Sequence, residues 1–333
     1  MKTIVGFFVL SLAQLVSWAL LAANNHQIVV QDAIGRNIQA PSPAQRIVTV
    51  SFAAHEVIRL LGANDRLVGT TSYVQGHAGD LFPEVQKLPN VGHAFRPNLE
   101  DLAKLRPDLV IAWVANPGPE MERALNPLGI AVLRLNFSRS DTFKRELTVL
   151  TEILGAQAVE AAEKYNKWAG LLEEQLLAKV RKYSVRPTVM IEQLTEATIA
   201  GRQSGAAVLA KMLMANNLGE QFPGQFSIVA NEWILRQNPQ IFIKMFAWRN
   251  REDDRKLEVM RRRQLDQVLQ RPSWDNIEAI RNKRVHILDA DYCGGPRYIV
   301  GLYQMAGWLY PNLVLPGRWQ EIEEEYFKLF QNF

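Results

Sequence analysis

The feature that most constrains the fold is a long stretch of helical periodicity near the middle of the chain, residues 156–182. Apolar side chains recur there every three or four positions, at Val159, Ala162, Tyr165, Trp168, Leu172, Leu176 and Val180. This spacing predicts one helix of about 25 residues, or about 38 Å at 1.5 Å per residue. A helix of that length is too long for a routine crossover within one small α/β lobe, so we expect it to bridge two lobes.

Short apolar runs alternate with helical patterns on both sides of this segment. Strands are predicted over residues 47–50, 67–70, 109–113, 130–135, 188–192, 241–245 and 285–288. Strands that alternate with helices indicate parallel sheets with helices on both faces. We therefore predict an α/β fold with two parallel-sheet lobes, residues 45–155 and 185–333, joined by a single rigid helix over 156–184. The ligand cleft is expected between the lobes.

The N-terminus has the pattern of a secretory signal peptide. Lys2 precedes an apolar stretch from Ile4 to Ala23, which ends in small residues. This pattern predicts a signal peptide over residues 1–23 that is cleaved to leave a periplasmic protein. The alternative is an uncleaved anchor, because the stretch is nearly long enough to span a membrane. No Cys lies near the cleavage region, so we expect no lipid attachment there.

Composition and motifs narrow the function classes. The net charge of +4 is spread along the chain, and the run Arg261–Arg263 lies among acidic residues, so we expect no nucleic-acid partner. Cys293 is the only cysteine, which excludes a disulfide or a Cys-rich zinc site within one chain. We find no Walker loop, nucleophile elbow, H-E-x-x-H motif or Rossmann glycine triplet, and therefore predict that the protein is not an enzyme.

Several segments resemble a known family. They include Pro97-Asn98-Leu99-Glu100, Leu105-Arg106-Pro107-Asp108-Leu109-Val110-Ile111-Ala112, Ala230-Asn231-Glu232-Trp233 and Gly295-Pro296-Arg297. Over most of residues 45–312 the chain is similar to the solute-binding proteins of ABC importers for iron-siderophores, haem and cobalamin. The resemblance implies a type III, helical-backbone fold and a monomer that works with an ABC permease and its ATPase. A ligand-sensing receptor subunit is the alternative from another class.

The resemblance also implies two positions for docking to the permease. In this family one glutamate on each lobe contacts arginines of the permease, and the matching residues are Glu100 and Glu232. The alternative is that both are acids near helix N-termini, where they favour the helix dipole.

The ligand-binding residues are expected beyond the carboxyl ends of the strands, where open parallel sheets bind their ligands. Ten residues are predicted to contact the ligand: Ser51, His55, Tyr73, Arg96, Trp113, Arg139, Arg202, Trp248, Tyr292 and Arg297. Further residues expected to face the cleft are Phe52, Ser72, His93, Phe95, Asn116, Phe137, Gln193, Gln203, Ser204, Phe246 and Cys293.

Two residue types dominate this set and suggest the ligand. Arginines bind carboxylate or catecholate groups, and aromatic rings stack on a flat organic molecule. We therefore predict a metal chelate, above all a ferric siderophore, and no cofactor apart from the iron or cobalt that the ligand itself contains. Alternatives are cobalamin, haem held by Tyr73 or Tyr292, an oxyanion such as molybdate, and a bare metal ion on His55, His93 and Asp291.

Overall fold

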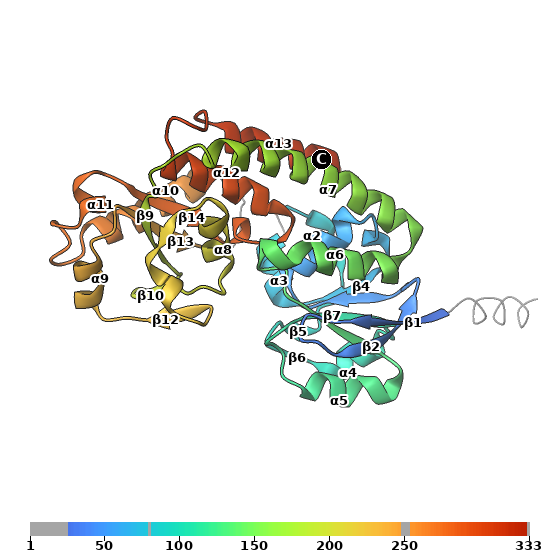
Figure 1. Cartoon of the computed structure of the whole chain (residues 1–333). Coiled ribbons are helices and arrows are strands. Elements are labelled where there is room, and N and C mark those ends of the chain that lie inside the picture. Colours follow the sequence, from blue (N-terminus) through green and yellow to red (C-terminus); the bar gives the residue numbers. More distant parts are fainter. Residues whose placement is uncertain (1–25, 79–80, 248–253, 332–333) are drawn as a thin grey trace, which may run out of the picture.

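The computed structural model describes residues 26–78, 81–247 and 254–331. They form two α/β lobes with one long helix across both (Figure 1). The predicted signal peptide over 1–23 and Trp248 lie outside the described residues. Within the described ranges, no helix combines the length and the apolar character needed to cross a membrane.

The N-terminal lobe is built on a four-stranded parallel sheet. Its order is β4-β3-β7-β8, with β4 at Leu67–Thr70, β3 at Ile47–Thr49, β7 at Leu109–Trp113 and β8 at Ala131–Leu135. Alternate residues of these strands face opposite sides, as strand geometry requires. One set packs on α2 (Phe52–Leu60) and α6 (Ser140–Leu154), and the other on α4 (Leu99–Lys104) and α5 (Glu120–Leu125). Both faces of the sheet are therefore buried, as the apolar strand sequences predict.

A β-hairpin extends this lobe towards the N-terminus. Strands β1 (His26–Gln31) and β2 (Asn37–Ser42) pair antiparallel. Between them, the Ala33 amide donates a hydrogen bond to the Arg134 carbonyl on β8, 2.9 Å away, and Arg36 forms an ion pair with Glu122 on α5 at 2.7 Å. The hairpin thus packs on the lobe, which begins before the predicted boundary at residue 45.

The C-terminal lobe contains a larger, mixed sheet. Its order is β12-β10-β9-β13-β14, with β12 at Phe226–Ile228, β10 at Thr198–Ala200, β9 at Thr188–Glu192, β13 at Ile241–Phe246 and β14 at Val285–Asp289. The strands β9, β13 and β14 run parallel, as predicted, and the short β11 (Asn216–Asn217) pairs parallel with β9. The edge strands β10 and β12 are antiparallel. The prediction of a parallel sheet therefore holds for its centre and not for this edge.

Helices cover both faces of this sheet as well. One face packs on α8 (Gly205–Met212) and α12 (Tyr298–Leu309). The other face packs with Ile234 of α9 (Asn231–Gln237), Val268 of α10 (Asp254–Leu269), Ala279 of α11 (Glu278–Arg281) and the buried Trp274.

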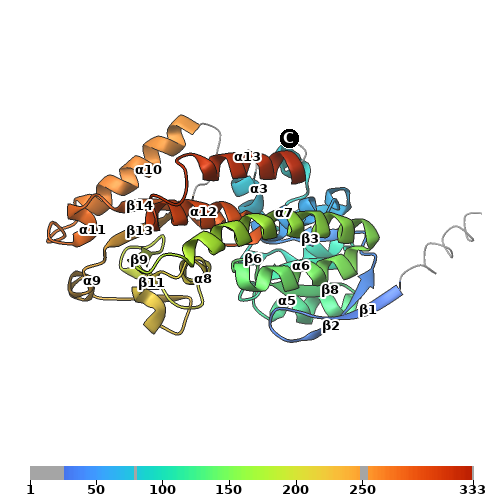
Figure 2. The same ribbon diagram turned by 45° about the horizontal axis from the view of Figure 1, so that its top comes forward.

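The long helix α7 (Ala156–Val180) joins the lobes as predicted. Its buried positions lie on one stripe: Ala158, Ala162, Tyr165, Ala169, Leu172, Leu176 and Val180. The final helix α13 (Arg318–Phe330) runs beside it, as Figures 1 and 2 show. Phe330 of α13 packs its ring against Tyr165 and Trp168 of α7. The connection between the lobes is therefore reinforced by a second helix that the long periodic segment alone does not reveal.

Candidate functional site

A cavity of about 430 Å³ lies between the lobes. Its walls come from the segments that follow β3, β7 and β8 in the N-terminal lobe and β9, β13 and β14 in the C-terminal lobe. The carboxyl ends of parallel strands from both sheets therefore meet at one site. This volume lies within the range of about 300–1,000 Å³ that is typical of small-molecule sites.

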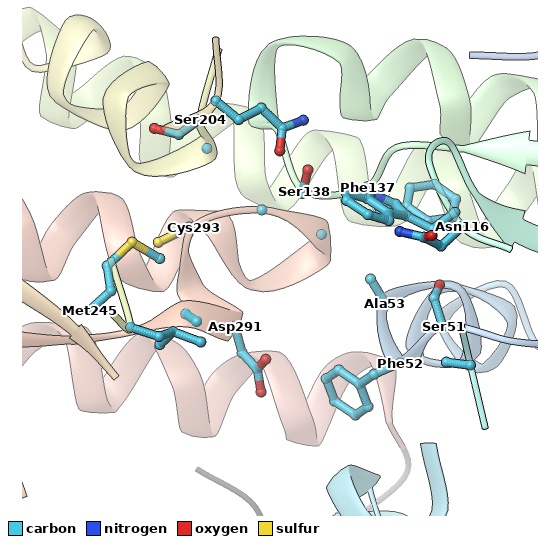
Figure 3. A pocket seen from close by; sticks show the side chains of 18 of the residues that line it. Ser51, Phe52, Ala53, Asn116, Phe137, Ser138, Ser204, Met245, Asp291 and Cys293 are labelled. Atoms are coloured by element: carbon cyan, nitrogen blue, oxygen red, sulfur yellow. The ribbon is translucent and has the colours of Figure 1, made fainter. Parts of the chain in front are cut away.

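The wall from the N-terminal lobe is mainly aromatic. It is lined by Phe52, Tyr73, Phe95, Trp113 and Phe137. Figure 3 shows Phe52 and Phe137 on this side of the cavity, together with Ser51 and Asn116. Local structure fixes the entry to α2: the Ser51 hydroxyl accepts a hydrogen bond from the Ala54 amide at 3.3 Å and caps the helix.

The Trp113 ring is oriented by a polar neighbour. Its indole Nε1 donates to the Asn136 side-chain oxygen at 3.3 Å, and the Ser138 hydroxyl donates to the same oxygen at 2.5 Å. The backbone amide of Asn136 in turn donates a hydrogen bond to the Glu146 carboxylate on α6 at 2.8 Å. The loop after β8 is therefore held in place beneath the aromatic wall.

The wall from the C-terminal lobe mixes sulfur, amide and hydroxyl groups. Figure 3 shows Met245, Cys293 and Ser204 there. Burial raises the pKa of the Cys293 thiol beyond its ordinary range, so the thiol is neutral and acts as a small wall residue. Gln193 also lines the cavity; it is 8% exposed, and its side-chain nitrogen has no hydrogen-bond partner among the described residues. Such a buried amide can bind a polar group of a ligand.

The two lobes touch backbone to backbone along one side of the cavity. The Gly295 amide donates a hydrogen bond to the Phe137 carbonyl across the lobes. A Cβ atom at Gly294 would lie 2.6 Å from the Cα of Ser138. A Cβ atom at Gly205 would lie even closer to the backbone carbonyl oxygen of Ser138. Only glycine permits this approach, so these positions set the distance between the lobes.

A buried charge network lies below the cavity and joins three parts of the chain. Arg297 has no exposed surface, and its Nε donates to Glu56 of α2 at 2.9 Å, while its Nη2 donates to Asp291 at 3.1 Å. Tyr326 of α13 donates its hydroxyl to Glu56 at 2.9 Å. Burial by itself would lower the pKa of Arg297, but the Glu56 and Asp291 carboxylates raise it above its usual value. Arg297 therefore stays charged and carries the counter-charge for both acids.

Three of the ten predicted ligand contacts line the cavity: Ser51, Tyr73 and Trp113. Two others lie below its surface, because Arg297 binds Glu56 and Asp291, and Tyr292 donates its hydroxyl to Glu323 at 2.5 Å. Their polar groups are used inside the protein, which does not fit the prediction of direct ligand contact.

The remaining predicted contacts lie elsewhere. Arg96 and Arg202 are exposed and do not line the cavity, and Arg139 is paired with Asp141 at 2.6 Å. His55 is buried against Thr49, 3.3 Å from its hydroxyl, and burial, together with Arg59, lowers its pKa to about 3. Trp248 is outside the described residues.

The three residues of the bare-metal alternative do not come together as a metal site. His93 is exposed, His55 is a buried residue of α2, and only Asp291 lines the cavity. Among the described residues, no group of three or more His, Cys, Asp or Glu side chains is arranged to hold a metal ion.

Part of the cavity wall was predicted from residues that follow the strands, and part of it was not. The expected residues Phe52, Phe95, Asn116, Phe137, Gln193, Ser204 and Cys293 line the cavity. Residues that line the cavity without having been predicted include Glu56, Leu194, Gln225, Phe226 and Met245. Glu56 lies one turn inside α2, and Gln225 and Phe226 belong to the short edge strand region, so neither follows a predicted strand. Met245 and Leu194 have a usable signal, because Met245 ends the predicted strand 241–245 and Leu194 follows the predicted strand 188–192.

Comparison with known proteins gives a family match. Residues 47–292 match the family model described as periplasmic binding protein. The uncharacterised ABC transporter substrate-binding lipoprotein YvrC of Bacillus subtilis is 24% identical over 293 residues, which cover 86% of each chain. The vitamin B12-binding protein of Vibrio campbellii is 26% identical over 263 residues, which cover 77% of this chain and 86% of the relative.

Solved structures share the fold at lower sequence identity. The molybdate-bound periplasmic binding protein MolA of Haemophilus influenzae has a TM-score of 0.74 at 18% identity, covering 92% of this chain and 98% of its own. Helicobacter pylori CeuE with bound Ni(II) has a TM-score of 0.71 at 22% identity, covering 92% and 96%. The family match spans well over half of the chain, and it confirms the resemblance seen in the sequence. The chain belongs to the periplasmic binding protein family.

Proposed function

We propose that this substrate-binding protein of an ABC importer captures a corrinoid, a metal chelate with flat apolar faces, and delivers it to a permease and its ATPase. The observation that carries the proposal is the composition of the cavity: five aromatic side chains form one wall, and none of the described lining residues is an arginine or lysine. Aromatic and apolar walls suit a broad ring system whose faces carry little charge.

The same observation argues against the ferric siderophore predicted from the arginines. A catecholate complex is strongly anionic and needs cationic partners in its site. In the described part of the cavity the ionisable groups include Glu56 and Asp291, which would repel such a ligand. A small oxyanion such as molybdate meets the same difficulty.

Similarity to other proteins supports the corrinoid class. The vitamin B12-binding relative aligns with 77% of this chain, more than either lobe contains. We further propose a periplasmic location after removal of residues 1–23, and a monomer as the working form.

The proposal is tested by calorimetric titration of the protein produced from residue 24 onward. The ligands are cyanocobalamin, a ferric catecholate, a ferric hydroxamate, haemin and molybdate. We expect cyanocobalamin to bind at least about 100-fold more tightly than the others, which corresponds to about 2.8 kcal/mol. Tighter binding of any other ligand in the set would overturn the corrinoid assignment.

A variant pair ties this binding to the cavity. Trp113→Ala removes part of the aromatic wall and is expected to weaken corrinoid binding by about tenfold or more, because buried aromatic contacts dominate binding energy. Ile228→Ala changes an 84% exposed side chain outside the cavity and serves as the control. Equal affinity of the two variants would contradict the proposed site.

A further inference from the structure

Gln193 lies where a central strand of the C-terminal lobe ends at the cavity. It directly follows β9 and belongs to the cavity wall. The residue is buried, and its side-chain nitrogen has no hydrogen-bond partner among the described residues. A buried N–H group without an acceptor is unfavourable, because it has lost its hydrogen bonds to water and gained none in return. The fold therefore keeps a donor at the cavity that no described residue satisfies.

The backbone of Gln193 is firmly held by its neighbours. Its amide donates a hydrogen bond to the Thr198 carbonyl on β10 at 2.7 Å, and its carbonyl accepts one from the Lys244 side chain at 2.6 Å. Lys244 also donates to the Leu194 carbonyl at 3.0 Å. Both main-chain polar groups of Gln193 are thus satisfied, so the missing partner concerns the side chain alone.

Lys244 is itself fixed by a buried ion-pair network. It lies on β13 next to the cavity residue Met245, and its Nζ is 2.9 Å from the Glu192 carboxylate. Arg271 donates to both oxygens of the same carboxylate, at 2.9 and 2.7 Å. Paired guanidinium–carboxylate bonds of this kind are strong and geometrically specific. The position of Gln193 is therefore set within the C-terminal lobe and does not depend on a ligand.

The two lobes present different kinds of group to the cavity. Trp113 and Phe137 line it from the N-terminal lobe, and Gln193 lines it from the C-terminal lobe. Aromatic rings stack on the face of a flat ligand, whereas a hydrogen-bond donor needs an oxygen atom, which such a ligand carries at its edge. The side-chain bonds of Gln193 can rotate between staggered positions, so the amide can turn into the cavity and donate to that oxygen.

We propose that Gln193 is a specificity residue, whose side-chain amide donates a hydrogen bond to a carbonyl-type oxygen of a carboxamide or a carboxylate at the edge of the bound ligand. This inference rests on the proposed function, and it adds the contact that orients the ligand within the cavity. A ligand without such an oxygen leaves the buried nitrogen unpaired and binds more weakly.

The first test removes the amide. Gln193→Met keeps the length of the side chain and lacks the donor, so calorimetric titration with cyanocobalamin should show binding about fivefold weaker or more. Gln304→Met is the matched control, because Gln304 of α12 is also a buried glutamine, 5% exposed, and does not line the cavity. The control should keep the parent affinity. Parent affinity in a folded Gln193→Met protein would overturn the inference.

Stability without ligand distinguishes a ligand contact from a structural one. In urea denaturation, Gln193→Met should be at least as stable as the parent, because it loses a buried donor that had no partner. A large loss of stability that accompanies the loss of binding would make Gln193 a structural residue and overturn the inference. Gln193→Ala also lacks the amide and adds no volume, so the contact can be tested even if Gln193→Met does not fold.

The second test separates a donor from an acceptor. Gln193→Glu has the same shape, and its ionised carboxylate accepts hydrogen bonds but cannot donate them. We expect it to bind cyanocobalamin at least as weakly as Gln193→Met does. Binding as tight as that of the parent would show that Gln193 acts as an acceptor and would overturn the proposed contact.

Haemin as a second probe separates this inference from the proposed function, because its carboxylates also offer acceptor oxygens. If haemin binds the parent, cyanocobalamin does not, and Gln193→Met weakens haemin binding, the corrinoid assignment fails and the role of Gln193 stands. If cyanocobalamin binds the parent and Gln193→Met equally, the assignment stands and the role of Gln193 fails. If neither probe binds the parent, both are overturned.

Discussion

Glu146 is a buried acid that supports the cavity from below. Its carboxylate accepts a hydrogen bond from the Asn136 amide at 2.8 Å, in the loop that orients Trp113. Burial raises the pKa of Glu146 to about 7, although the hydrogen bond from Asn136 opposes this shift. Between about pH 4.5 and pH 7, Glu146 keeps its proton in the folded protein and releases it in the unfolded chain. The free energy of unfolding therefore falls as pH rises through this window, by at most about 1.4 kcal/mol per pH unit.

Replacing this acid by its amide should remove that loss. Glu146→Gln keeps an oxygen for the Asn136 amide and cannot ionise. We expect its Tm to match the parent near pH 4.5 and to exceed it above pH 7, as measured by calorimetry across the range. Glu160→Gln, an exposed position on α7, is the control and should follow the parent. Parallel curves of Tm against pH for Glu146→Gln and the parent would show that Glu146 ionises normally.

For single residues, the sequence predicts the position of aromatic residues in the cavity wall better than the position of charged residues. Phe52, Trp113 and Phe137 were expected at the cleft because they end or directly follow apolar strands, and the strand pattern is local. Arg297 is buried as a counter-ion, and does not contact the ligand, because it pairs with Glu56, which is 241 residues away in sequence. No local pattern shows such a partner, so a buried counter-ion and a ligand-binding arginine look the same in the sequence.

The helix α8 places Gly205 at the contact between the lobes. Ser204 caps this helix by accepting from the Ala207 amide at 3.2 Å, and Gly205 follows it. A Cβ atom at Gly205 would lie 2.5 Å from the Cys293 carbonyl oxygen and nearer to the Ser138 oxygen. Backbone atoms cannot move aside as a flexible side chain can, so an added methyl group must displace α8 or part the lobes.

Gly205→Ala is therefore expected to lower the free energy of unfolding by about 1–3 kcal/mol, the usual cost of overpacking, and to weaken ligand binding. Urea denaturation and calorimetric titration measure the two effects. Gly170→Ala on α7 is the control, because no atom lies within 4 Å of the added Cβ; in mid-helix this change is expected to stabilise by about 0.5–1 kcal/mol. A Gly205→Ala protein as stable as the parent would show that the contact between the lobes is not rigid.

Elements differ in how clearly the sequence predicts them, and their length explains much of the difference. The central strands of both sheets and the long helix α7 follow predicted segments closely, because the strands are continuous apolar runs and the helix is long enough for its period to be recognised. The edge strands β10 and β12 have three residues each, too few to show a period. Their antiparallel pairing, and with it the position of Phe226 in the cavity, could not be predicted from such short segments.

For the molecule as a whole, the two residues predicted to dock on the permease are exposed acids, one on each lobe. Glu100 lies on α4, with its side chain 79% exposed and paired with Lys104, and Glu232 lies exposed on α9. Both helices lie away from α7 in Figure 1. We expect the double change Glu100→Lys and Glu232→Lys to reduce uptake of labelled ligand by cells at least about tenfold, because like charges would face permease arginines.

Ligand affinity of that double variant should be unchanged, since neither residue lines the cavity. The control reverses Glu160 and Glu163 on α7, which are also exposed, and should leave uptake intact. Normal uptake with the double change at Glu100 and Glu232 would dismiss these residues as the docking pair.

The lobe count and the bridging helix could be predicted from the sequence, whereas the path of the last helix could not. The sequence of α13 is amphipathic, with Ile322, Tyr326 and Phe330 on its buried face. It does not say that this face returns to α7 and to the N-terminal lobe, where Tyr326 donates to Glu56 and Arg59 donates to Gln331. Amphipathicity gives the face that is buried, and only the tertiary structure gives its partner.

This return of the chain has a consequence for the order in which the protein can mature during synthesis. Glu56 leaves the ribosome early, while its partners Arg297 and Tyr326 are among the last residues to emerge. Until these partners are present, the N-terminal lobe lacks the guanidinium and the hydroxyl that bind the Glu56 carboxylate and cover it. The first lobe therefore gains its full stability only when the C-terminal helices arrive, and until then the emerging polypeptide remains easier to unfold.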